Sequence, residues 1–282
     1  MENYIEKYYA LTSLKEGLTN VIETRFSGLK ELRDNLENLL LLLPENTLEN
    51  IKYEKKKLEK IIFINGNINY EKSAGLLLNL ENFYKSSIET VKKELEKMVE
   101  NFLKEAEIPE IEGEVFGLIL PHAGYIFSGF VAGHGFKLIS GKNFKNIILI
   151  GDSHYEWFDG VSIWEKGFWE TPFGKVKVNE KLAKKILSHS KRFFVKDSAH
   201  LFEHSLEVQL PFLQKVLEDF EIVPIIFGSE NKDWKDLARA ILNSMEKNTL
   251  VIVSSDLSHY PSYEIANQVD LETIEAILKC NP

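Results

Sequence analysis

Apolar and charged positions alternate along the chain with a period that changes near residue 108. Before that point, apolar residues recur at helical spacing over residues 1–43 and again over residues 71–107, which predicts amphipathic helices. Between these stretches, residues 54–60 are mostly charged and residues 61–64 are apolar. They predict an exposed helix followed by a short strand or hairpin. We therefore expect a mainly helical N-terminal region over residues 1–108.

After this region, short apolar runs alternate with amphipathic stretches. This alternation is typical of a parallel sheet with helices on both faces. The expected strands are residues 115–120, 146–150, 161–164, 222–227 and 249–253, and the expected helices are residues 129–140, 180–189, 203–218, 232–246 and 262–279. Residues 168–178 are expected to form a hairpin that turns at Gly174. The pattern thus predicts an α/β domain over residues 109–282.

Three of the expected strands are followed by a loop that carries a histidine. His122 follows the first strand, His154 the second and His259 the last. The carboxyl ends of parallel strands open on one edge of a sheet, so these side chains should meet there if their strands are neighbours. Neutral imidazoles suit Fe, Zn or Cu, and a few of them with an open position form a reactive metal site. The alternative is that each histidine only forms a hydrogen bond within its own loop.

Two further residues are candidates for catalysis. Asp256, three residues before His259, could orient a ligand histidine or cap the helix that follows. His204 lies four residues after His200, and we expect it to reach into the pocket as a general acid or base. A separate zinc site with His200 and a polar first helical turn are the alternatives, although the spacing differs from the His-Glu-x-x-His zinc pattern.

Composition narrows the classes of partner. The 34 basic and 43 acidic residues give a net charge of −9, which opposes binding to nucleic acid. No apolar run approaches the roughly 20 residues of a membrane helix. The N-terminus lacks a signal-peptide pattern and the chain has a single cysteine, so we expect a cytoplasmic protein. Neither a glycine-rich phosphate loop nor a Gly-x-Ser-x-Gly elbow is present, so a nucleotide-driven or serine-hydrolase mechanism is unsupported.

The loops with histidines contain motifs that resemble those of the Memo family, also called AmmeMemoRadiSam system protein B. That family is related in fold to LigB-type extradiol non-haem iron dioxygenases. The motifs are Pro121-His-Ala-Gly-Tyr125 with Ser128-Gly129, Gly151-Asp-Ser-His154, Trp169-Glu-Thr-Pro-Phe-Gly174, Glu203-His-Ser-Leu-Glu-Val-Gln-Leu-Pro-Phe-Leu213 and Ser254-Ser-Asp-Leu-Ser-His-Tyr260. The resemblance covers residues 113–282 and implies a three-layer α/β domain with a central, parallel-rich sheet.

The resemblance also implies a function. It implies a metal pocket, or the vestige of one, built from His122, His154 and His259, with His204 alongside. Fe(II) is the expected metal, and Cu or Zn are alternatives. An oxygenase-like or redox enzyme that acts on a small molecule is therefore the leading hypothesis. A non-catalytic scaffold that binds a peptide or protein, and a metal-dependent hydrolase, are the other hypotheses.

Two departures from the family pattern stand out. The family's pocket also uses a cysteine in a Cys-Gly-x-Gly-Pro-like motif further along the chain, whereas Cys280 lies only 21 positions after His259 and outside such a motif. We expect Cys280 to be an ordinary helix residue and the domain to lack its C-terminal elements. The resemblance also leaves residues 1–108 unexplained. Their amphipathic faces could cover the sheet, or join a second copy or a partner subunit.

Overall fold

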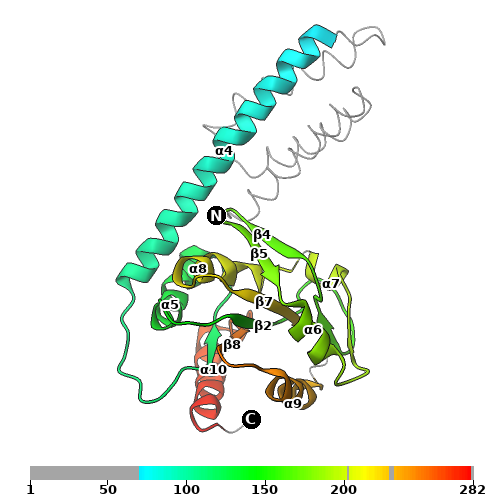
Figure 1. Cartoon of the computed structure of the whole chain (residues 1–282). Coiled ribbons are helices and arrows are strands. Elements are labelled where there is room, and N and C mark those ends of the chain that lie inside the picture. The colour runs from blue at the N-terminus through cyan, green and yellow to red at the C-terminus, as the bar shows by residue number, and fades with distance from the viewer. Residues whose placement is uncertain (1–69, 202, 229–231, 281–282) are drawn as a thin grey trace. The chain divides into compact units, whose positions relative to one another are not determined.

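A computed structural model describes residues 70–201, 203–228 and 232–280, including the side chains from residue 88 onwards (Figure 1). The helices predicted within residues 1–43, the charged helix at 54–60 and the strand at 61–64 lie outside the described residues. The chain divides into two compact units, Met1–Met98 and Val99–Pro282. The long helix α4 (Tyr70–Glu105) confirms the helical period expected there and contributes to both units.

The second unit is built on a mixed, mostly parallel sheet. Its strands are β1 (Gly117–Leu120), β2 (Asn146–Asp152), β3 (Val161–Ile163), β4 (Phe168–Thr171), β5 (Gly174–Val178), β6 (Phe193–Phe194), β7 (Glu221–Phe227) and β8 (Thr249–Ser254). The main order is β1-β8-β2-β7-β3-β6. Neighbours in β1-β8-β2-β7 are parallel, whereas β3 runs antiparallel to β7 and β4 antiparallel to β5. The predicted α/β fold with a parallel-rich sheet is confirmed.

Helices cover both faces of this sheet. They are α5 (Tyr125–Leu138), α6 (Glu180–Leu187), α7 (Ser198–Leu201), α8 (Leu210–Val216), α9 (Trp234–Ser244) and α10 (Tyr263–Leu278), with a 3₁₀ turn at Glu207–Gln209. On one face, α6 and α9 pack on the side chains of Ile148 and Ile225. On the other, Phe136 of α5 stacks on Phe212 of α8 with ring centroids 4.8 Å apart. Both rings are fully buried, so each face has its own core.

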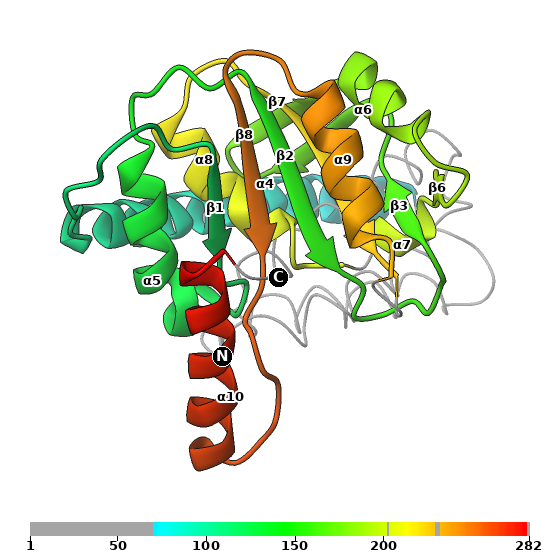
Figure 2. The ribbon, with the colours of Figure 1, turned by 90° about the horizontal axis from the view of Figure 1, so that it is seen from below.

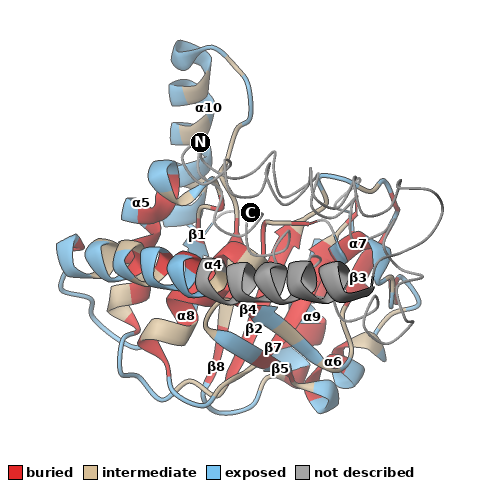
Figure 3. Ribbon diagram, turned by 90° about the horizontal axis from the view of Figure 1, so that it is seen from above, coloured by how far each residue is buried: buried red, intermediate tan, exposed pale blue. Residues whose placement is uncertain are grey.

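The last helix differs from the others because it has no buried residue. It extends away from the sheet in Figure 2, and it is coloured as exposed or intermediate in Figure 3. The side chain of Ser262 accepts a hydrogen bond from the Ile265 amide and caps its first turn. None of the described helices is both long and apolar enough to cross a membrane.

Two expected helices have other boundaries in the structure. The helix expected over residues 129–140 begins four residues earlier, at Tyr125. The helix expected over residues 203–218 is instead a loop, the 3₁₀ turn and the short α8. Pro211 lies in the first turn of α8, where its missing amide proton costs nothing, so it favours a helix start at that point. Residues 203–206 are thereby free to turn toward the sheet. The predicted hairpin is confirmed, but Pro172 and Phe173 form its turn and Gly174 begins β5.

Candidate metal centre

Three neighbouring strands end at the same edge of the sheet. They are β1, β8 and β2, which lie side by side in that order. The loops after them carry His122, His259 and His154, and one ring nitrogen from each histidine lies within 4.8 Å of the others. The ring centroid of His122 is 5.1 Å from that of His154 and 6.2 Å from that of His259. The predicted meeting of the three histidines is therefore confirmed.

His122 is the buried member of this cluster, with 1% of its surface exposed. Its backbone N–H donates to Asp256 Oδ1 over 2.6 Å, and the N–H of Ala123 donates to the same oxygen over 3.0 Å. Its Nδ1 lies 3.1 Å from Ser254 Oγ. Burial lowers the pKa of the His122 ring, although Asp256 and Asp152 oppose that shift. The ring is therefore neutral at pH 7, and its buried Nε2 has no hydrogen-bond partner among the described residues.

His154 is held by a buried carboxylate. Glu203 Oε2 accepts from the His154 backbone N–H over 2.6 Å, and Oε1 lies 2.9 Å from Nδ1. Burial alone would raise the pKa of Glu203, but hydrogen bonds from His154 and the Ser205 amide outweigh burial and lower it. Glu203 is thus ionised and can only accept, so Nδ1 of His154 carries the proton. Nε2 of His154 is therefore the ring nitrogen that is available to the cluster. This Nε2 atom lies 3.6 Å from Asp152 Oδ2.

A glycine allows Glu203 to come this close. Gly151 lies in β2, and a Cβ atom there would be 2.7 Å from Ser205 Oγ and 2.9 Å from the Leu206 side chain. Only a residue without a side chain lets the loop around Glu203 approach the end of β2. Sequence reasoning missed Glu203 as a site residue. Its place directly before His204 was the available signal.

His259 lies on the exposed side of the cluster. Its Nδ1 is 3.1 Å from the carbonyl oxygen of Leu257. A carbonyl can only accept, so Nδ1 is the donor and Nε2 carries the lone pair. Leu257 and Tyr260 have φ values of 64° and 66°. Left-handed backbone is rare for such large side chains, so the loop around His259 is held in an unusual conformation.

A fourth histidine completes the pocket. The ring of His204 lies 5.0 Å from that of His154 and 5.7 Å from that of His122. Its Nδ1 is 3.5 Å from Glu203 Oε1 and has no hydrogen bond among the described residues. Burial lowers the pKa of His204, so its ring is neutral at pH 7. The expected position of His204 beside the three others is confirmed. A second possible ligand group consists of His154, Glu203 and His204.

The remaining candidates are also placed. Asp256 does not cap the following helix, since Ser262 does so; it binds the backbone at His122 instead. His200 is on α7, where Nε2 lies 2.9 Å from Ser162 Oγ and the ring packs against Trp164 and Trp169. Within the described part of the chain, neither possible metal group includes His200, so a zinc site shared by His200 and His204 is not formed.

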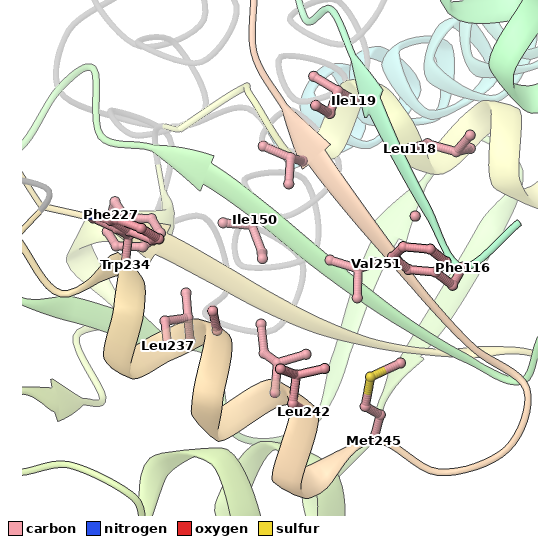
Figure 4. A pocket seen from close by; sticks show the side chains of 14 residues that line it. Phe116, Leu118, Ile119, Ile150, Phe227, Trp234, Leu237, Leu242, Met245 and Val251 are labelled. Carbon is pink, nitrogen blue, oxygen red and sulfur yellow. The ribbon is translucent and has the colours of Figure 1, made fainter. Parts of the chain in front are cut away.

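Cys280 is exposed just after α10 and belongs to neither possible metal group of the described residues. A hollow of about 560 Å³ lies elsewhere, between α9 and the strands β1, β8 and β2. Its lining is apolar throughout and includes Phe116, Trp234 and Met245 (Figure 4). None of the histidines of the cluster lines this hollow.

Exchanging Glu203 for glutamine tests how His154 is held. A glutamine has one oxygen in place of two and adds an NH₂ group that cannot accept from His154 or Ser205. Because such partners orient a ligand histidine, Glu203→Gln should weaken Zn(II) binding about 10- to 100-fold in a calorimetric titration. Glu246→Gln, an exposed carboxylate paired with Lys181, is the matched control. Equal affinities of the two variants would contradict this role.

Comparisons with known proteins agree with the geometry. A family described as Memo-like protein matches residues 81–282. A MEMO1 family protein of Saccharolobus islandicus is 38% identical over 208 residues, which span 70% of this chain and 73% of the relative. A MEMO1 family protein of Methanobrevibacter smithii is 39% identical over 206 residues, 68% of this chain and 73% of the relative. One from Thermotoga neapolitana is 45% identical over 169 residues, 58% of this chain and 60% of the relative. This chain therefore belongs to the Memo-like protein family.

Proposed function

We propose that this protein is a metal-dependent redox enzyme that binds one Fe(II) ion at the Nε2 atoms of His122, His154 and His259. The observation that carries the proposal is the convergence of one ring nitrogen from each histidine within 4.8 Å. Imidazole nitrogens are good ligands for Fe, Cu and Zn, and three protein ligands leave coordination positions open for small molecules.

The residues at this site fit a divalent cation. His122 Nε2 is buried without a hydrogen bond among the described residues, and a buried acceptor in this state is costly unless something binds it. Three carboxylates surround the cluster, those of Asp152, Asp256 and Glu203. Among the described residues, no lysine or arginine forms an ion pair with them. These carboxylates attract positive charge, so the site favours a cation over an anion.

The side chains have distinct tasks in this proposal. The chemistry that a bound ferrous ion supplies is the activation of dioxygen together with an oxygen-bearing substrate. His204 is neutral and adjacent, so it takes a proton from a substrate hydroxyl and later returns it. Asp256 holds the backbone on either side of the His122–Ala123 peptide bond and so orients the buried ligand.

The test begins with the metal content of protein purified without added metal. About one equivalent of metal, or uptake of one equivalent of Fe(II) under anaerobic conditions, is the expected result. His259→Ala, which alters an exposed ring, should lack this uptake. Failure of the wild type to take up Fe(II), Cu(II) or Zn(II) would overturn the proposal and favour a non-catalytic scaffold.

Oxygen consumption then separates redox chemistry from hydrolysis. Fe(II)-loaded protein with catechol as a probe should consume oxygen faster than the His204→Gln variant loaded to the same level. Hydrolysis of a phenyl ester that depends on bound metal, without oxygen uptake, would replace the redox proposal with a hydrolase that activates water.

A further inference from the structure

Ser254 connects two strands beneath the histidine cluster. It is the last residue of β8, and its Cα pairs with that of Leu120, the last residue of β1. This register places the buried Ser254 hydroxyl below the loop that leads to His122. Its Oγ contacts three groups: Nδ1 of His122 at 3.1 Å, Nε2 of Gln209 at 2.8 Å and the carbonyl of Ser205 at 2.6 Å.

The direction of each hydrogen bond follows from the chemistry of the partners. A hydroxyl has one proton to donate and can accept two hydrogen bonds. The Ser205 carbonyl can only accept, and the short 2.6 Å contact assigns the Ser254 proton to it. The Gln209 amide nitrogen can only donate, and its orientation is fixed because it also donates to the Pro121 carbonyl over 2.9 Å. The third contact therefore requires an N–H at Nδ1 of His122.

The opposite tautomer of His122 fits the site poorly. It would put a proton on Nε2, which is buried and has no hydrogen-bond partner in the described structure. The nearest carboxylate oxygen, Asp256 Oδ2, is 3.7 Å away, too far for a hydrogen bond. If Nδ1 then took the Ser254 proton, the Ser205 carbonyl would lose its donor. Both changes leave buried polar groups unpaired, which disfavours this tautomer.

We propose that Ser254 is a positioning residue for metal binding: it holds His122 as the Nδ1–H tautomer, so that the Nε2 lone pair faces the cluster. This inference rests on the proposed function, because metal binding is what the Nε2 lone pair would serve. Glu203 and the Leu257 carbonyl hold His154 and His259 in the same way. All three rings then present the same nitrogen.

The experiment compares three variants with the wild type. Ser254→Ala removes the acceptor for His122 Nδ1, whereas Ser254→Thr keeps the hydroxyl. Gln209→Leu disturbs the same network but leaves the acceptor of His122 in place. The first readout is the ¹⁵N NMR spectrum of the metal-free protein, with the His122 signals assigned by their loss in His122→Gln. The second is Zn(II) affinity by calorimetric titration.

We expect the wild type, Ser254→Thr and Gln209→Leu to show only the Nδ1–H form of His122. Ser254→Ala should show a mixture of tautomers and bind Zn(II) about 10- to 100-fold more weakly. A wild-type spectrum with the Nε2–H form would overturn the inference. So would an unchanged Zn(II) affinity or an unchanged tautomer in Ser254→Ala. The wild-type spectrum decides even if Ser254→Ala does not fold.

The two proposals fail in different ways. A wild type that binds neither Zn(II) nor Fe(II) overturns the proposed function, and it removes metal binding as the purpose of Ser254. The metal-free spectrum would then still report whether Ser254 sets the tautomer. Normal metal binding in both the wild type and Ser254→Ala would instead overturn the role of Ser254 and leave the proposed function standing.

Discussion

His259→Ala is expected to abolish stable binding of a divalent metal ion, and His122→Ala to do the same. Each change removes one of three nitrogen ligands, so the loss should exceed the about 10- to 100-fold that removal of an outer hydrogen-bond partner costs. His259 is exposed, and its truncation opens no cavity in the core. Elemental analysis and a Zn(II) titration of each variant measure the effect.

The control for this prediction is another histidine of the same domain. His134 lies on α5, where its Nδ1 bonds to the Phe130 carbonyl, and it belongs to neither possible metal group of the described residues. His134→Ala should therefore bind metal like the wild type. If His259→Ala and His134→Ala bind Zn(II) equally well, the three-histidine site does not exist in solution.

The stability of the protein should fall as the pH decreases from 7 to 5, in part because of His200. Burial lowers the pKa of this ring to about 4, and only Glu203 opposes the shift. The unfolded chain takes up its proton near pH 6.5, whereas the folded protein does not. The contribution of His200 to stability is therefore complete above pH 6.5 and lost toward pH 4. It amounts to about 3 kcal/mol, of which about 2 kcal/mol is lost between pH 7 and pH 5.

Urea unfolding of wild type and His200→Gln at pH 7 and pH 5 measures this term. The variant has no ring to protonate, so its stability should fall less than that of the wild type over this range. His189→Gln, which changes an exposed histidine, should behave like the wild type. An equal loss of stability in His200→Gln and wild type would show that His200 takes up its proton as readily in the folded protein as in the unfolded chain.

Much of the fold was predictable because it depends on local pattern. Buried strands such as β2 and β7 need continuous apolar runs, and amphipathic helices such as α6 and α9 need a period near 3.6, so both leave a signal in a few consecutive residues. The boundary error over residues 203–218 arose where pattern and contacts disagree. That stretch has helical spacing, yet its first residues fold around the site because Glu203 binds His154.

The candidate site was also predictable as far as it depends on local pattern. His122, His154 and His259 each follow an apolar run, and parallel strands that end at one edge bring such residues together. The order β1-β8-β2 then makes all three strands neighbours. That order comes from pairing between residues far apart in the chain, for which the local pattern has no signal. The sequence was enough to recognise the three strands. It could not show that they are neighbours, and the prediction that the histidines meet depended on this.

The partners of the histidines depend on tertiary structure throughout. Glu203 binds a histidine 49 residues away, and Ser254 contacts one 132 residues away. Asp256 had two possible roles in the sequence. Ser262 caps the helix, and Asp256 instead accepts from the backbone of His122, 134 residues away. Residue type and local spacing established which side chains could bind a metal and near which strand ends they lie. Strand register and the packing of distant loops established which ring nitrogen each histidine presents, because a hydrogen bond forms between atoms that are close in space, whatever their separation in the chain.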